Sequence, residues 1–162
     1  DADAIFDAEW TIDASAIRPM VSWGTSPGQS IAIDAAIPAD ADPRALAYIG
    51  LSAGQPIAGT PLDAAFIGSC TNARLSDLRR AAAIVAGKHV APSIAKALVV
   101  PGSSAVKRAA EAEGLDRIFT AAGFEWRMSG CSLCFYAGGE GFAPGSRVIS
   151  STNRNFEGRQ GP

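Results

Sequence analysis

Apolar residues in the second part of the chain alternate between short runs and longer stretches with helical spacing. The short runs are typical of buried strands and lie at residues 65–68, 97–100 and 147–151. Between the first two, a helix is predicted from Ser76, as its N-cap, to Gly87, with Leu78 and Ala82 on its apolar face. Two further helical stretches follow the second run, one opening after Pro101 and one ending at Gly123. This alternation predicts βαβ units and a parallel sheet.

Residues 1–63 are less regular and rich in proline and turn signals. One short helix is predicted from Pro43 to a stop at Gly50. We therefore expect a single α/β domain, in which 1–63 form an irregular lead-in with short strands and one helix, and 64–162 carry the sheet.

Composition narrows the class of protein. At 162 residues and 48% hydrophobic content, the chain is long enough to bury a core without disulfides. Its net charge of −2 argues against nucleic acid or an anionic membrane as the main partner. No apolar run approaches the roughly 18 residues of a membrane span, and the acidic first residues are unlike a signal peptide. We expect a cytoplasmic protein.

Three cysteines lie in glycine-flanked turns, namely Cys70, Cys131 and Cys134. Any one of them alone is most simply a small buried hydrophobe, and an odd number disfavours a disulfide framework. A C-x-x-C pair with a third cysteine in another loop suits a shared metal site. Zinc with His89 as the fourth ligand is one reading, although His89 falls beyond the end of the helix that leaves the Cys70 loop. A four-iron cluster with one open iron is the other.

A second candidate is the polar segment that follows the last predicted strand. It carries Asn153, Arg154 and Arg159. Each arginine has the geometry to hold a carboxylate through two parallel hydrogen bonds. The alternative is that these are ordinary surface residues in a turn, where asparagine is common.

Taken together, these segments resemble the aconitase superfamily, and most closely its isopropylmalate dehydratase branch. The likeness runs from about Trp10 to the C-terminus and corresponds to about the last third, the third domain, of a full-length large subunit. The matching strings occur in family order: Trp23-Gly-Thr-Ser-Pro-Gly-Gln, Phe66-Ile-Gly-Ser-Cys-Thr-Asn-Ala-Arg, Val99-Val-Pro-Gly-Ser, Gly123-Phe-Glu-Trp-Arg, Gly130-Cys-Ser-Leu-Cys and Asn153-Arg-Asn-Phe-Glu-Gly-Arg-Gln-Gly.

The resemblance implies an aconitase-type three-layer α/β fold and an iron-sulfur hydro-lyase. Cys70, Cys131 and Cys134 would ligate a [4Fe-4S] cluster, Arg154 and Arg159 would hold the carboxylates of a small diacid, and Asn153 would lie beside the cluster. Such enzymes interconvert 2- and 3-isopropylmalate, in leucine biosynthesis, by removing and re-adding water. Their remaining acid and base groups lie on N-terminal domains of the parent chain and on a separate small subunit, so this chain alone is expected to be inactive.

Some positions depart from the family pattern. Phe135 and Tyr136 follow the C-x-x-C pair where the family has smaller residues, and Met128-Ser129 precedes Gly130 where the family has a pair ending in proline. The sequence therefore leaves open a related hydratase of another small diacid. A non-catalytic metal-binding or partner-docking remnant is a further alternative.

Overall fold

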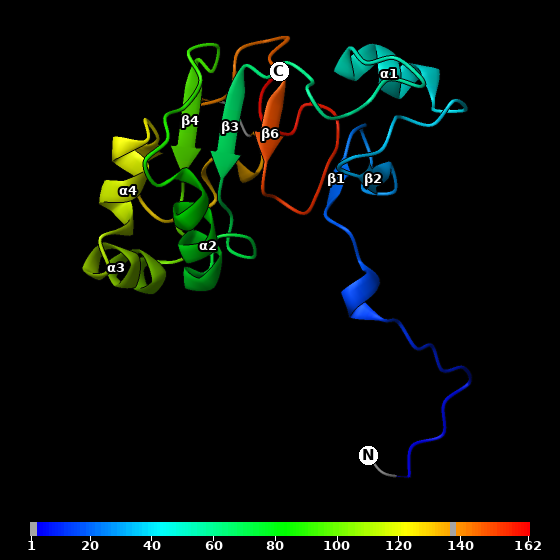
Figure 1. Ribbon diagram of the computed structural model, residues 1–162, viewed down its shortest axis with the longest axis horizontal. Coiled ribbons are helices and arrows are strands. Elements are labelled where there is room, and N and C mark those ends of the chain that lie inside the picture. The colour runs from blue at the N-terminus through cyan, green and yellow to red at the C-terminus, as the bar shows by residue number, and fades with distance from the viewer. Residues whose placement is uncertain (1–2, 137–138) are drawn as a thin grey trace.

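The computed structural model describes residues 3–136 and 139–162. Residues 3–19 run as an exposed arm that holds one short 3-10 turn, η1 (Ala14–Ala16), and extends away from the rest of the chain (Figure 1). The helices that follow are α1 (Pro43–Ile49), α2 (Leu75–Val85), α3 (Ser104–Ala112), α4 (Leu115–Ala121) and the 3-10 turn η2 (Ser132–Cys134). The strands are β1 (Met20–Ser22), β2 (Ser30–Ala32), β3 (Ala64–Ile67), β4 (Lys96–Val99), β5 (Glu125–Trp126) and β6 (Val148–Ser150).

The central sheet has the strand order β5-β4-β3-β6, and all of its pairings are parallel. Phe66 of β3 lies opposite Leu98 of β4 and Ser150 of β6. The predicted α/β class with a parallel sheet is confirmed. Because the strands are parallel, the loops after β3, β4, β5 and β6 all leave from the same edge, where sites in such folds form.

The two faces of the sheet are covered differently. Helices α2, α3 and α4 pack on one face around Val99 and Phe119, both fully buried, and Figure 1 shows them grouped together there. On the other face, Phe66 and Leu98 pack against Leu133 and Phe142. Among the described residues, the second covering layer therefore comes from the chain that follows β5 and not from helices. This layer carries the C-x-x-C pair.

Local sequence accounts for most helix ends, with one exception. Helix α1 begins after Asp42, whose carboxylate accepts a hydrogen bond from the Arg44 amide at 2.9 Å, and stops at Gly50 with φ +67, as predicted. The prediction that Ser76 is the N-cap of α2 is wrong. The N-cap is Arg74, because the Asp77 carboxylate at the third helical position accepts a hydrogen bond from the Arg74 amide at 3.1 Å and so fixes the start of the helix there.

The lead-in contains its own hairpin and apolar cluster. Strands β1 and β2 pair as an antiparallel hairpin, and Trp23, Ile37 and Ala45 form a third apolar cluster. Arg147, which directly precedes β6, donates hydrogen bonds to the carbonyl groups of Ile49 and Gly50 at 3.0 and 2.9 Å. A cation thus satisfies the C-terminal carbonyls of α1. No helix in the described part of the chain is long and apolar enough to cross a membrane.

Candidate functional site

The first cysteine lies at the end of the central strand β3. Ser69 directly precedes it and is buried with φ +84, a conformation that a non-glycine residue rarely adopts. Cys70 itself is exposed. Beneath this turn, the amide of Gly102 donates to the Ala73 carbonyl at 3.0 Å. A Cβ atom at Gly102 would lie only 3.0 Å from that oxygen, so the loop after β4 and the Cys70 loop are in direct backbone contact.

Ser151 joins the Cys70 loop to the segment that holds the two arginines. The buried amide of Gly68 donates to Ser151 Oγ at 3.0 Å, and the Ser151 amide donates to the Phe66 carbonyl at 3.0 Å. The strand pairing of β3 with β6 is thereby continued one step beyond the sheet. The polar segment 152–162 consequently starts directly beside the Cys70 turn.

The C-x-x-C pair lies in the 3-10 turn that covers the helix-free face of the sheet. The Cys134 amide donates to the Cys131 carbonyl at 2.8 Å, so the two residues form one turn. Leu133 between them is 1% exposed and packs in the core with Phe66 and Leu98. Cys131 is exposed and Cys134 is half-buried. One apolar anchor thus leaves both thiols outside the core.

Arg159 and Gln160 bind this turn from the C-terminal segment. Arg159 Nε donates to the Cys134 carbonyl at 2.7 Å, and its Nη2 lies 3.6 Å from Cys134 Sγ. Gln160 Nε2 donates to the Leu133 carbonyl at 2.8 Å. Arg159 is buried, at 6% exposure, with its guanidinium carbon 5.7 Å from the centre of the Phe156 ring. Within the described residues, its buried Nη1 has no hydrogen-bond partner.

Asn153, Arg154 and Arg159 all line one cavity of about 920 Å³. Its walls come from the β1–β2 hairpin, the end of α1, the loop that includes residues 57–62, and the chain from Phe142 through β6 to the C-terminal segment. Among the described residues that line it, the charged side chains are Arg147, Arg154 and Arg159, and none is a carboxylate. A cavity with cationic walls and a buried guanidinium donor lacking a partner favours an anionic ligand.

The structure therefore brings the predicted site residues together in part. The residues of the polar segment share the cavity, whereas the three cysteines do not line it. Arg159 connects the two groups, because it both lines the cavity and contacts Cys134. His89 is exposed in the loop after α2. Across residues 3–136 and 139–162, no three side chains of His, Cys, Asp or Glu gather closely enough to hold a single metal ion.

The comparisons with known proteins decide the family. The model of the aconitase family (aconitate hydratase) matches residues 1–162. The chain belongs to the aconitase family. It is 62% identical over 172 aligned residues to a 3-isopropylmalate dehydratase large subunit of Cupriavidus necator, and 55% identical over 175 to a 3-isopropylmalate dehydratase large subunit 1 of Bradyrhizobium diazoefficiens. All of the chain is aligned in both cases, but it spans only 64% and 36% of those proteins' lengths. The resemblance read from the motifs is confirmed.

Members of the aconitase family typically carry a [4Fe-4S] cluster. The donors that this aconitase-family chain offers suit such a group. Three thiols come from two loops that leave the same edge of the sheet, and none of them is buried. Three thiol donors without a fourth protein ligand match a cluster that keeps one iron open.

Sequence reasoning did not single out several residues that build this aconitase-family site. Ser151 and Gln160 fix the loops through hydrogen bonds at 3.0 and 2.8 Å. Both lie close in sequence to predicted site residues, and this proximity was the signal from which they could have been found. Glu140 was also missed. It accepts hydrogen bonds from Lys96 and Arg127, whose distance along the chain gave no sequence signal.

Proposed function

We propose that this chain is the cluster-ligand portion of a 3-isopropylmalate dehydratase large subunit. In that role it would be one part of an enzyme that interconverts 2- and 3-isopropylmalate by removing and re-adding water. One observation carries the proposal. Arg159 is buried, binds the turn of Cys131 and Cys134 through its Nε, and is one of the residues that line the cationic cavity, while its buried Nη1 has no partner among the described residues. A single side chain thus connects a thiol-rich turn to a site suited to carboxylates.

The cysteines favour a cluster over a single metal ion. A zinc site requires its ligands to converge on one point, and the described residues contain no such group. A four-iron cluster takes one thiolate on each of several irons, so its cysteines are spread around a larger group. Cys70 from the loop after β3, and Cys131 and Cys134 from the turn after β5, fit that arrangement as its three ligands.

The residues of this chain would bind and orient the substrate. When bound, the cluster supplies a Lewis-acid iron that polarises the leaving hydroxyl group. Arg154 and Arg159 would hold the two carboxylates through charge-assisted hydrogen bonds and offset the negative charge that develops when a proton is removed beside one of them. Asn153 lies between these arginines and β6 and would direct its amide toward the same ligand. The cavity walls would exclude water around these contacts.

The proton-transfer groups would come from outside this chain. None of the described residues that line the cavity is a histidine or a carboxylate, the groups most often used as general base. We infer that N-terminal domains of the parent large subunit and a separate small subunit supply them. The chain alone would then bind the cluster without turning over substrate.

Anaerobic reconstitution of the chain with iron and sulfide tests the cluster. Broad absorption near about 400 nm is expected for the wild type, and it should be lost in Cys70→Ser, Cys131→Ser and Cys134→Ser. Glu113→Gln is the matched control, because it breaks only an exposed ion pair with Arg79 on the helical side of the sheet. Uptake of one zinc ion in place of iron and sulfide would contradict the proposal.

The arginines are tested in the full-length large subunit assembled with its small subunit. Arg154→Lys and Arg159→Lys keep the charge but lose the planar pair of donors, so kcat/KM should fall about 10²-fold or more. Arg18→Lys, in the exposed arm before β1, is the control. Turnover of other small diacids in preference to isopropylmalate would instead assign the chain to a related hydratase. Phe135, half exposed beside Cys134, is the residue to vary in that case.

A further inference from the structure

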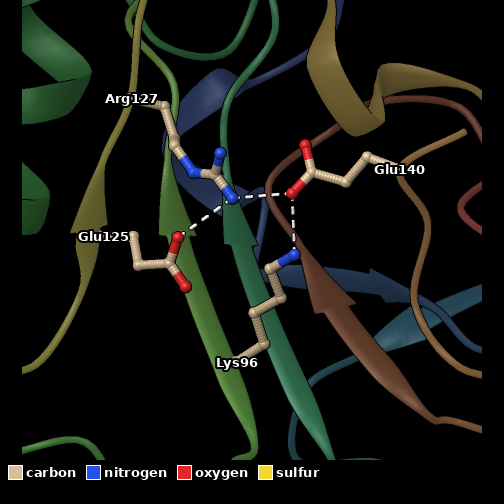
Figure 2. A network of polar contacts seen from close by, with 4 residues as sticks. All are labelled: Lys96, Glu125, Arg127 and Glu140. Atoms are coloured by element: carbon tan, nitrogen blue, oxygen red, sulfur yellow. Dashed lines mark hydrogen bonds and ion pairs between the residues drawn. The ribbon is translucent and has the colours of Figure 1, made fainter.

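Four charged residues form a network over the helix-free face of the sheet (Figure 2). Glu140 Oε1 accepts hydrogen bonds from Lys96 Nζ at 2.7 Å and from Arg127 Nη2 at 2.6 Å. Arg127 Nη2 also lies 2.9 Å from Glu125 Oε2. The Glu140 carboxylate therefore forms ion pairs with Lys96, the first residue of β4, and with Arg127, which directly follows β5.

The network closes the base of the loop that carries Cys131 and Cys134. The chain leaves the sheet at Arg127, whose amide makes a bond of 2.9 Å to the Val99 carbonyl. After the C-x-x-C turn, the chain lies over the same face of the sheet at Glu140. The Glu140 carboxylate there accepts a hydrogen bond from the Arg127 side chain. The two ends of this loop are thus joined by one hydrogen bond and anchored to β4 through Lys96.

We propose that Glu140 is a positioning residue for the cysteine pair, and that the ion network with Lys96 and Arg127 holds the C-x-x-C turn at the edge of the sheet. The inference rests on the proposed function in one respect, because it takes Cys131 and Cys134 to be cluster ligands. Glu140 acts through the loop and does not touch the cluster or the substrate.

The location of the network distinguishes it from an ordinary surface ion pair. Phe142, two residues after Glu140, is buried against Leu133, which lies between the two cysteines. Movement of Glu140 away from the sheet would therefore disturb the packing that seats the turn. The Lys96 side chain is only 27% exposed, so its ammonium is partly shielded from water. The pair of Arg79 with Glu113 joins α2 to the end of α3 on the opposite face and belongs to neither cysteine loop.

Thiol labelling of the metal-free chain tests the inference without any cluster. Cys134 is half-buried and its Sγ contacts Arg159, so its reaction with a maleimide reports how well the turn is seated. Cys70, exposed on another loop, is the internal reference. In Glu140→Gln, the rate at Cys134, resolved by mass spectrometry, should rise about two- to fivefold while the rate at Cys70 stays constant. A Cys134 rate no higher than in Glu113→Gln would overturn the inference.

A change in overall stability is separated from a local effect by the same variants. Glu140→Gln removes two partly exposed ion pairs, and Glu113→Gln removes one that is held through two hydrogen bonds, so both variants should lower the melting temperature only slightly. Lys96→Met provides a second way to break the network and should raise the Cys134 rate as well. If both Glu140→Gln and Lys96→Met melt earlier with Cys70 and Cys134 labelling equally faster, the role is general stabilisation and the inference is wrong.

The reconstituted protein provides the second readout. After removal of iron from solution, the absorption near about 400 nm should decay faster in Glu140→Gln than in wild type or Glu113→Gln. Equal decay rates would overturn the inference. Failure of the wild type to take up any cluster would overturn the proposed function, whereas the labelling rates would still decide whether Glu140 seats the turn.

Discussion

The two loops that carry cysteines are fixed by different kinds of interaction. The Cys70 loop is short and held by the backbone, through the strained Ser69, the close approach of Gly102, and the bond from Gly68 to Ser151. The C-x-x-C loop is longer and held by side chains, chiefly Arg159, Gln160 and Glu140. Backbone groups of the first loop make most of the contacts that fix it, whereas side chains fix the second loop.

This difference predicts which of the two loops tolerates amino-acid substitutions. Backbone contacts in the Cys70 loop leave no room for added atoms, so substitutions there should cost stability directly. The side-chain contacts of the C-x-x-C loop are individually modest and partly exposed, so single losses should loosen the turn without unfolding the domain. The predictions below test this contrast.

The largest effect is expected at Gly102. Gly102→Ala would place a Cβ atom 3.0 Å from the Ala73 carbonyl and 3.3 Å from that of Cys70. The Cys70 loop must then shift, and we expect a loss of about 1–3 kcal/mol in the free energy of unfolding, measured by urea denaturation. Gly28→Ala is the control, because its nearest contact would be an ordinary 3.7 Å. Equal stability of the two variants would contradict the view that close backbone contacts hold the Cys70 loop.

A smaller loss is expected at Ser151. Ser151→Ala leaves the buried Gly68 amide without its acceptor at 3.0 Å, which should cost about 1–2 kcal/mol in the free energy of unfolding. Ser151→Thr keeps the hydroxyl group and should retain most of the stability. If threonine and alanine destabilise alike, the hydrogen bond does not hold the loop.

The opposite sign is expected at Ser69. Its φ of +84 is strained for serine and easy for glycine, and its side-chain contacts to Thr71 and Asn72 are long, at 3.4 and 3.5 Å. Ser69→Gly should therefore be neutral or stabilising by up to about 1 kcal/mol. Ser69→Val should be clearly destabilising, since a β-branched residue resists positive φ. A destabilised glycine variant in thermal unfolding would show that the side chain matters more than the backbone.

The smallest effect is the pH dependence of the second loop. The Lys96 ammonium, followed by Arg127, holds the pKa of Glu140 below its ordinary value near 4.5. A carboxyl group with a lowered folded pKa stabilises the protein above that ordinary value and loses its contribution as pH falls through the folded pKa. The free energy of unfolding of the wild type should therefore exceed that of Glu140→Gln by about 0.2–1 kcal/mol at pH 7, and the two values should converge as the pH falls. A difference in the free energy of unfolding that does not change with pH would contradict a stabilising role of the Glu140 carboxylate.

Local patterns in the sequence were sufficient for three strands of the central sheet and for most of the helices, but they did not predict the two-residue strand β5. The apolar runs located β3, β4 and β6, and Gly50 marked the end of α1. The motif cysteines and Arg159 were singled out as candidate site residues, since their spacing and polar setting are visible along the chain, and their roles stay a prediction. The burial of Arg159 and its contact with Cys134 were not predicted, because they depend on how β6 returns beside β3.

Long-range partners explain what the sequence could not predict. Glu140 lies 44 residues from Lys96 and meets it only after the loop folds back over the sheet. The start of α2 is a different case, because it was placed at Ser76 as a common cap whereas a local contact between Asp77 and the Arg74 amide fixes the N-cap two residues earlier.

The most direct test of the central claim is the metal content of the chain after anaerobic reconstitution. If Cys70, Cys131 and Cys134 together hold a [4Fe-4S] cluster, the purified wild type should retain about four iron and four sulfide per chain, with marked loss in each cysteine-to-serine variant. Retention of about one metal ion and no sulfide, or iron content unaffected by all three substitutions, would contradict it.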